Sequence, residues 1–478
     1  MILKGYLFGV LYALLCLALA LVLYKIGMPK KYSRKLVHIL VGAEWIILSH
    51  YMGASYHFLI VCLFFLALLL ISYLKNLMPM ISSDGDNAPG TVYYAVAMSI
   101  MAIICLFVPK MMLPFGIGVL CTSLGDGFAG VVGQAIKKYN PKIYGEKSLF
   151  GTLANFAFSS GSALFIKYVY GAELSVLQCL LIGLLSAGLE LVSVFGLDNI
   201  FITVGTAFLA YGFINFPLLN TFSLPIVATP FIIAAVLEKK VLTKVGLLFA
   251  MILDVVVALT LGNFGFTLLC VFLFGSVIID KIKKHRRGED AVAKKGDCRD
   301  GVQVIANGLI PMMFAILYSI TANDIYLIAY VAALAEAFAD TAASGMGAFS
   351  NNAYDVFKFR RIKRGLSGGM SLVGTLSSLV ASFVIGAIAY AFGAVSPISM
   401  LVISLAGFAG AIFDSFLGSV FQIKYKCKKC GEILEREVHC DARCVRYSGF
   451  EFFDNDVVNL LSGAFAAILA AAVAFVTF

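Results

Sequence analysis

The chain has 478 residues, of which 61% are hydrophobic and 13% are charged, whereas a soluble domain carries roughly 25% charged residues. This composition excludes a water-soluble enzyme and also a disordered, fibrous or disulfide-stapled protein. The formal net charge is +9, but a basic balance in a membrane protein mainly reflects its cytosolic loops. We therefore expect no nucleic-acid partner.

Apolar runs are numerous enough for about 16 transmembrane helices, because a hydrocarbon core of about 30 Å needs about 20 residues. The runs are 5–24, 36–52, 56–74, 92–108, 112–136, 148–170, 174–196, 200–216, 223–237, 245–261, 263–280, 301–320, 324–346, 368–392, 397–423 and 454–478. The first run is longer than the core of a signal peptide, so we expect a retained helix. The predicted fold is an all-α polytopic integral membrane protein.

The basic loops predict the orientation in the membrane. If the sides alternate from an outside N-terminus, the loops rich in Lys and Arg all fall on one face: 25–35, 137–147, 238–244, 281–299, 358–364 and 424–446. Cytosolic loops carry such an excess of positive charge. We therefore expect a multi-pass protein of the cell inner (plasma) membrane, with both termini extracytoplasmic and the active sites facing the cytosol.

The chain contains the same series of motifs twice, in the same order. The first series is SRKLVHILVG (33–42), GDGFAGVVG (125–133), LFGTL (149–153) and LDN (197–199). The second is CRDGVQVIANG (298–308), AFADTAASGMG (337–347), LVGTL (372–376) and FDN (453–455). Such a repeat predicts two homologous helix bundles. The predicted domains are 1–215 and 299–478, joined by transmembrane segments and a basic cytosolic loop at 216–298.

Asp126 is the first candidate functional residue, because an ionisable residue in an apolar span is costly unless it faces a partner or a watery cavity. Its flanking glycines permit either close helix packing around a buried ion pair, or approach of a phosphate to a carboxylate that holds Mg²⁺. Phosphoryl transfer needs little beyond positioning and charge neutralisation. The other candidates for this site are Arg34, Lys35, His38, Lys147, Ser148, Glu190, Asp198 and Asn199.

The loop DGDNAPGTVYY (84–94) is either an ordinary connection or a nucleotide lid. Together with RK-x-x-H, GDGFA and G-x-KS-LFGT, it resembles the dolichol kinase and phytol kinase family. Members of that family are membrane enzymes that phosphorylate isoprenoid alcohols with CTP or another nucleoside triphosphate. The resemblance covers residues 1 to about 215. It implies a prenyl alcohol kinase. We expect Asp126 or Glu190 to be the catalytic base and Asp126 to be a candidate Mg²⁺ ligand, although either carboxylate could instead be the metal ligand.

The second half resembles the membrane family that includes the plant phytyl-phosphate kinase. Five strings carry this resemblance: RDGVQVIANG, ADTAASGMG, GLSGGMSLVGTLSS, GFAGAIFDSFLGSVFQ and FDNDVVNLLS. It implies a site that phosphorylates a lipid monophosphate. We expect Asp340 or Asp414 to be the base and Asp340 to be a candidate Mg²⁺ ligand, although either carboxylate could instead be the metal ligand. The implied lining residues are Arg299, Gln303, Asn307, Asp340, Ser367, Asp414, Asn455, Asp456 and Asn459.

Two details of the second half bear on its activity. Gly345 stands where relatives usually have an acidic residue, and Glu336, one helical turn before Asp340, could substitute for it. The SGG turn that includes Gly368 and Gly369 can present backbone amides to a phosphate. Asp454, the first residue of the DND motif at 454–456, can be either a site residue or a cap of the helix that follows.

A cysteine-rich insertion spans 425–450. It contains C-x2-C-G at 427–431 and HC-x3-C at 439–444, a spacing that suits a tetrahedral zinc site. The expected ligands are Cys427, Cys430 and Cys440, with either His439 or Cys444 as the fourth. Four protein ligands would make the zinc structural, because no coordination position stays open. The alternative is a set of reduced cysteines without metal.

These observations predict a bifunctional kinase that converts a prenyl alcohol to its monophosphate and then to the diphosphate. The expected partners are the lipid bilayer, the prenyl alcohol or prenyl phosphate and the nucleoside triphosphate, and we expect no protein partner. The alternatives are a CTP-dependent lipid cytidylyltransferase and a secondary transporter. Duplicated bundles with carboxylates at mid-depth are typical of transporters, whereas most polar residues here lie near the cytosolic ends of the spans.

Overall fold

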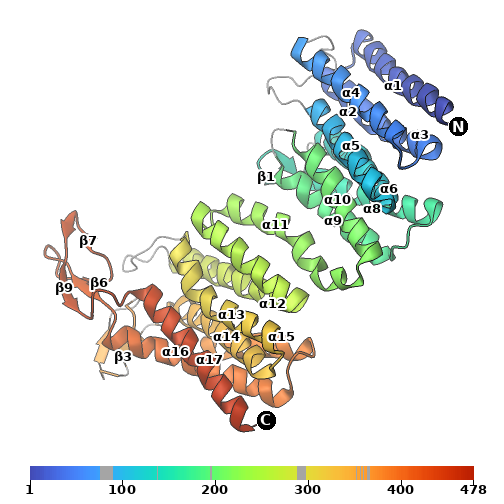
Figure 1. Cartoon of the computed structure of the whole chain (residues 1–478). Coiled ribbons are helices and arrows are strands. Elements are labelled where there is room, and N and C mark those ends of the chain that lie inside the picture. The colour runs from blue at the N-terminus through green and yellow to red at the C-terminus, as the bar shows by residue number, and fades with distance from the viewer. Residues whose placement is uncertain are drawn as a thin grey trace. The chain divides into compact units, whose positions relative to one another are not determined.

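The computed structural model describes residues 1–75, 90–136, 138–193, 196–287, 298–350, 352–355, 357–358, 360–362 and 366–477, with only the backbone at 30, 31, 34, 286 and 287. The described chain is mostly helical, with a few short strands (Figure 1). Twelve of its helical segments are long and apolar enough to cross a membrane. The all-α membrane fold is confirmed, whereas the predicted number of 16 spans is not.

The difference in span number has local causes. The run predicted at 36–52 falls on two short helices, α2 (Lys30–Val41) and α3 (Ala43–Met52), which meet at Gly42. The runs predicted at 245–261 and 263–280 correspond to two helices within α12 (Lys244–Arg287), which meet at the non-helical residue Gly262 with φ 59° and count as one of the twelve segments. Apolar composition predicts which residues can lie in the membrane, but it does not predict at which residue a helix breaks.

The chain divides into two compact units, Met1–Lys239 and Lys240–Phe478. This division falls inside the stretch predicted to link the two halves. Each unit has its own hydrophobic core of buried side chains.

Unit 1 is a bundle arranged around one interrupted span. This span consists of α6 (Met112–Leu120), the π-helical turn η2 (Cys121–Asp126) and α7 (Gly127–Ala135), and it packs against α2, α8 and α10. The other elements are α1 (Ile2–Lys25), α4 (Tyr56–Lys75), α5 (Gly90–Phe107), η1 (Pro109–Met111), β1 (Lys142–Tyr144), β2 (Lys147–Ser148), α8 (Leu149–Tyr170), α9 (Val176–Val192), α10 (Asp198–Asn215), η3 (Pro217–Phe222) and α11 (Ser223–Lys239).

Unit 2 is a bundle around α14 (Asp324–Gly347), which packs against α12, α13, α15, α16 and α17. The other helices are α13 (Gly301–Thr321), α15 (Leu372–Ala391), α16 (Pro397–Val420) and α17 (Asn455–Thr477). The strands are β3 (Ala353–Asp355), β4 (Arg360–Ile362), β5 (Lys424–Lys426), β6 (Ile433–Leu434), β7 (Val438–His439), β8 (Ala442–Arg443) and β9 (Val445–Ser448). In the insertion, β5 lies between β6 and β9, and β7 pairs with β8.

The two units share a local packing motif at the positions that the sequence repeat aligns. A Cβ atom built on Gly133 would lie 3.5 Å from the Cα atom of Gly151, and one built on Gly347 would lie 3.6 Å from the Cα atom of Gly374. In each unit a serine hydroxyl directly before the second helix accepts a hydrogen bond from the amide of the second glycine. Close approach of two helices requires such small residues.

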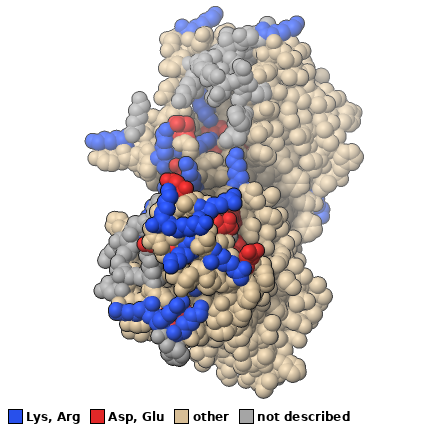
Figure 2. Space-filling view, turned by 90° about the vertical axis from the view of Figure 1, so that its left-hand side faces the viewer, with Lys and Arg blue, Asp and Glu red and all other residues tan. Residues whose placement is uncertain are grey.

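The described charged side chains are unevenly distributed over the surface. On the face drawn in Figure 2, a broad part of the surface carries few Lys, Arg, Asp or Glu side chains. Many large apolar side chains are exposed, among them Leu259, Val380 and Ile468. An apolar surface of this kind is what lipid contact requires of a membrane-spanning bundle.

The Gly118→Ala substitution is expected to destabilise unit 1, because a Cβ atom there would lie 2.2 Å from the backbone oxygen of Thr203 in α10. Forcing a methyl group into a packed contact costs about 1–3 kcal/mol. The midpoint of thermal unfolding of the purified protein in detergent should fall by several degrees. Gly161→Ala is the matched control, since nothing lies within 4 Å of a Cβ atom at Gly161. Equal midpoints for the two variants would contradict this account.

Candidate functional site

Asp126 lies at the end of the π-helical turn η2, and its carboxylate is buried. Lys35 from α2 donates to its Oδ2 atom at 2.8 Å, and the Nε2 atom of His38 lies 3.4 Å from the same oxygen. Gly130 makes room for this contact, because a Cβ atom there would lie 2.5 Å from the Cε atom of Lys35. The π-helical geometry fits a functional site, where such turns are frequent.

A second ion pair lies in the same unit. The Nζ atom of Lys147, in β2, donates to the Oε1 atom of Glu190, which is buried in α9. Burial alone would lower the pKa of Lys147, but attraction to Glu190, Asp126 and Asp198 raises it above the usual value. Lys147 therefore stays cationic at neutral pH and provides a fixed positive charge among three carboxylates.

The start of α10 completes this cluster. Asp198 interacts electrostatically with Asp126 and with the two lysines, Lys35 and Lys147. The side-chain amide of Asn199 donates to the backbone oxygen of Gly90 at 3.1 Å, which attaches the end of the predicted lid loop to α10. Residues 84–89 of that loop and the side chain of Arg34 lie outside the described part of the chain.

Unit 1 thus brings together most of the residues expected at its site. The described set consists of the cations Lys35, Lys147 and, when protonated, His38, and the carboxylates Asp126, Glu190 and Asp198. Ser148 instead caps α8 by accepting a hydrogen bond from the amide of Gly151. Because the positive and negative charges of this buried set balance, the site carries no net charge when it is empty, and it can still bind a charged ligand.

Unit 2 brings carboxylates together with fewer cations. Glu336 and Asp340 from α14 and Asp414 from α16 interact electrostatically. Ser462 of α17 donates to the Oδ2 atom of Asp414 at 3.3 Å, and the amide nitrogen of Asn459, in its hydrogen-bonding orientation, lies 3.2 Å from the same oxygen.

Arg299 is the cation that interacts with Asp340 in this cluster. Its guanidinium also lies 3.4 Å from the carboxylate of Asp280. The Oε1 atom of Glu336 is buried and has no hydrogen-bond partner among the described residues. The cluster is therefore richer in negative charge than the one in unit 1, and oxygen-rich sites of this kind suit a divalent cation.

Glycine at position 345 also has a structural reason. A Cβ atom on Gly345 would lie 2.2 Å from a side-chain carbon of Ile279 in α12. An acidic side chain at this position would collide with α12, whereas Glu336 lies within the carboxylate cluster.

Several predicted residues of unit 2 make local contacts at helix ends. Gln303 forms a reciprocal capping box with Asp300 at the start of α13, and the Asn307 amide donates to the backbone oxygen of Gln303 at 2.9 Å. Asp454 accepts hydrogen bonds from the amides of Asp456 and Val457, both at 3.2 Å, as its interpretation as a cap predicts. Asn455 is exposed in the first turn of α17, and Asp456 is buried there.

The SGG turn lies directly before α15. Gly368 has φ +84°, and a Cβ atom on it would lie 2.5 Å from the backbone of Ser419, so no other residue fits there. The backbone amide of Ser367 donates to a carboxylate oxygen of Glu435, and Lys424 donates to the backbone oxygen of Ser367. The turn is therefore attached to the cysteine-rich insertion.

Several buried ionisable residues were not predicted from the sequence, among them Glu44 and Lys424. Glu44, in α3, is buried, and its Oε1 atom has no hydrogen-bond partner in the described chain. Its position inside an apolar run was the signal that could have identified it. Lys424 is nearly buried beside the SGG turn, and burial, followed by repulsion from Lys358, lowers its pKa to about 8.

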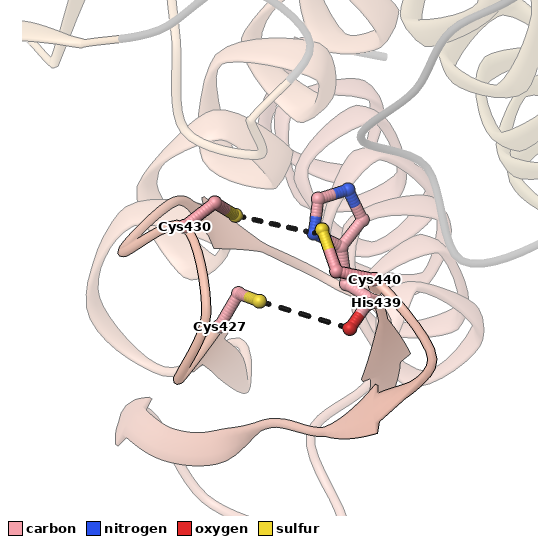
Figure 3. A group of neighbouring side chains, drawn as sticks. All are labelled: Cys427, Cys430, His439 and Cys440. Atoms are coloured by element: carbon pink, nitrogen blue, oxygen red, sulfur yellow. Dashed lines mark hydrogen bonds between the residues drawn. The ribbon is translucent and has the colours of Figure 1, made fainter.

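Four potential metal ligands lie together in the insertion. The side-chain ligand atoms of Cys427, Cys430, His439 and Cys440 are all within 4.8 Å of one another (Figure 3). Cys444 is not a member of this group.

Comparison with known proteins finds relatives among membrane proteins. The chain is 30% identical over 191 residues to a protein named phytol kinase from Synechocystis sp., a match that covers 38% of this chain and 79% of that protein. It is 34% identical over 161 residues to the uncharacterized membrane protein MJ0933 from Methanocaldococcus jannaschii, covering 33% of this chain and 64% of that one. It is 25% identical over 248 residues to the chloroplastic protein VTE6 of Arabidopsis thaliana, covering 50% and 67%.

No solved structure matches the chain. Residues 227–467, about half of the sequence, match the family described as integral membrane protein DUF92. This match includes the whole of the carboxylate cluster of unit 2 and the cysteine-rich insertion. With its membrane-spanning helices, the chain belongs to the DUF92 family of integral membrane proteins.

Proposed function

We propose that the chain is a bifunctional isoprenoid kinase. Unit 1 phosphorylates a prenyl alcohol, and unit 2 phosphorylates the resulting monophosphate to the diphosphate, with CTP or another nucleoside triphosphate as the donor. The name of one relative, phytol kinase, supports a role in this chemistry. The positive loops favour sites at the cytosolic surface of the plasma membrane and termini on the opposite side.

The observation that carries the proposal is a buried charged cluster beside an apolar cavity. In unit 1 a cavity of about 460 Å³ is lined by residues that include Leu124, two positions before Asp126, and Ile39, next to His38. Phe158 and Phe165 also line this cavity and are more than a third exposed. A prenyl chain could enter from the lipid and present its hydroxyl group to the carboxylates.

The proposed reaction at unit 1 is a direct transfer. The prenol oxygen forms a bond to the γ-phosphorus while the bond from that phosphorus to its bridging oxygen breaks, which releases the nucleoside diphosphate. The hydroxyl proton passes to Glu190, which forms an ion pair with Lys147. We assign this role to Glu190 because the Oδ2 atom of Asp126 already contacts two basic side chains, Lys35 and His38. Lys35 and Lys147 compensate the charge of the transferred phosphoryl group.

The residues present fit a magnesium ion. The Oδ1 atom of Asp126 takes part in neither of the two Oδ2 contacts, and it would hold the ion in unit 1. In unit 2, Asp340 and Asp414 would hold it, together with Glu336, whose Oε1 atom has no hydrogen-bond partner in the described chain. Bound Mg²⁺ neutralises phosphate charge and aligns the triphosphate.

A test follows from the mass of the products. The purified protein in detergent is incubated with labelled CTP, Mg²⁺ and either geranylgeraniol or phytol, and the lipids are analysed by mass spectrometry. We expect prenyl monophosphate first and diphosphate later. Transfer of a cytidylate group to the lipid would instead show a cytidylyltransferase. Absence of any lipid product with all prenols and nucleotides would contradict the kinase and leave the transporter alternative.

A further inference from the structure

We propose that Cys427, Cys430, Cys440 and His439 bind a zinc ion that fixes the position of the SGG turn at residues 367–369. The Nδ1 atom of His439 lies 3.4 Å from the Sγ atom of Cys430 and 3.3 Å from that of Cys440 (Figure 3). In a tetrahedral site with Zn–S near 2.3 Å and Zn–N near 2.0 Å, sulfur and nitrogen ligands lie about 3.5 Å apart. The two distances from His439 are thus close to those of a tetrahedral zinc site.

Two tight turns bring these ligands together. The first spans Cys427 to Gly431, where the Gly431 amide donates to the backbone oxygen of Cys427 at 3.0 Å and Gly431 has φ +75°. The second joins β7 to β8, and its residues Cys440 and Asp441 have φ values of 53° and 54°. Left-handed backbone is uncommon for residues other than glycine, so a metal bond would offset the cost of this turn.

The donor set selects the metal. Three thiolates and one imidazole are soft or borderline ligands, and such sets prefer Zn²⁺ to the Mg²⁺ that the oxygen clusters of the helix bundles suit. Four protein ligands leave no open position, which points to a structural ion. Cys444 lies nearby, but its sulfur is outside the group of converging atoms.

The insertion holds the SGG turn from both sides. Glu435 accepts a hydrogen bond from the Ser367 amide at 2.8 Å, and Lys424 donates to the Ser367 oxygen at 2.9 Å. Leu366 packs against Cys427 and Leu434. Because Cys427 is both a proposed ligand and a packing partner of Leu366, loss of the ion would release the turn.

Metal analysis of the untagged full-length protein tests the site. We expect about one zinc per chain, and we expect Cys430→Ser and His439→Ala to lose it while Cys444→Ser, the matched control, retains it. Zinc lost in Cys444→Ser and retained in His439→Ala would overturn the choice of the fourth ligand. Wild-type protein without zinc, after purification in zinc-containing buffer, would overturn the site itself.

Hydrogen exchange tests the link to the turn without any kinase assay. Zinc is removed from the wild-type protein with a chelator, and exchange is followed by mass spectrometry. The peptide that contains residues 366–369 should exchange at least tenfold faster after chelation, and readdition of zinc should restore its protection. Peptides from the core of α14 serve as the internal control for folding. Unchanged exchange at 366–369 with complete loss of zinc would overturn the positioning role.

A second inference comes from a different observation and rests on the proposed function. We infer that the stacked rings of Phe128 and Phe158 limit the length of prenyl chain that unit 1 accepts. Their centroids are 3.9 Å apart with an interplanar angle of 8°. Counting from the aligned aspartates, Phe128 corresponds to Ala342, and counting from Gly151 and Gly374, Phe158 corresponds to Ala381.

The two units have apolar cavities at corresponding places. Leu124 in unit 1 and Phe338 in unit 2 each line a cavity two positions before the aspartate. On the neighbouring helix, Phe158 lines one cavity and Ala381 the other. The volumes are about 460 Å³ in unit 1 and about 720 Å³ in unit 2. The aromatic pair thus occurs beside the smaller cavity.

Crosslinking with photoreactive prenols of increasing length tests this inference independently of phosphorylation. Phe158→Ala should increase labelling by the longest analogue relative to the shortest about tenfold, because added apolar contact strengthens binding. Phe208→Ala, an exposed aromatic outside the cavity lining, should leave the ratio unchanged. An unchanged ratio in Phe158→Ala, or no labelling of the wild-type cavity, would overturn the inference. Labelling without phosphorylation would contradict the kinase but not the cavity.

Discussion

Asp126→Asn is expected to abolish formation of the prenyl monophosphate, with a loss of at least about a thousandfold in rate. The substitution removes the charge that Lys35 and His38 contact. It therefore leaves cations uncompensated in a buried site, which is costly, and it removes the proposed ligand of Mg²⁺. The measurement is the rate of monophosphate formation from geranylgeraniol, with thermal unfolding recorded in parallel.

The control for this variant is Glu146→Gln. Glu146 is also acidic and lies close in sequence to the site, but it forms an exposed pair with Lys142, and such pairs contribute little. Asp126→Asn should still convert supplied prenyl monophosphate to diphosphate, because that step belongs to unit 2. Loss of both steps in a folded variant would contradict the assignment of two separate sites.

Asp340→Asn is expected to cause the complementary defect. Prenyl monophosphate should accumulate, and diphosphate formation should fall at least about a hundredfold, because the carboxylate cluster of unit 2 loses its proposed metal ligand. Asp324→Asn, at the exposed start of the same helix, is the matched control. The ratio of diphosphate to monophosphate in a time course is the measurement.

The outcome for Asp340 also tests Glu336. If Glu336 supplies the acidic group that Gly345 lacks, Glu336→Gln should show the same accumulation of monophosphate as Asp340→Asn. A normal diphosphate yield from Asp340→Asn would show that unit 2 is not a second kinase.

Composition and motif order predicted the membrane fold and the residues of unit 1 that lie together. Lys35 and Asp126 were both expected at this site, and GDGFAGVVG indicated the small residues beside Asp126, but spacing within one helix does not predict a contact between residues 91 positions apart. The role of Gly130 as space for the stem of Lys35 could not be predicted, because a glycine pattern does not identify which side chain fills the gap.

The sequence was less informative at helix ends and breaks. Gln303 was expected at a ligand site, but the same side chain satisfies a capping box with Asp300, and a polar residue near a helix start fits both roles. The break at Gly262 in α12, by contrast, lies between two predicted runs, and glycine readily adopts the positive φ found there. Glu44 escaped notice because no motif surrounds it.

The π-helical turn η2 has a consequence for exchanging segments between the halves. The corresponding stretch of α14 is continuous α-helix, and one additional residue in a turn rotates everything before it by about 100°. Side chains before Cys121 therefore point in other directions than those at the same number of positions before Asp340. A chimera of the two halves that is joined after the aspartate should keep the contacts of that aspartate. A chimera joined before the π-helical turn should instead turn the wrong face of the preceding helix toward its neighbours.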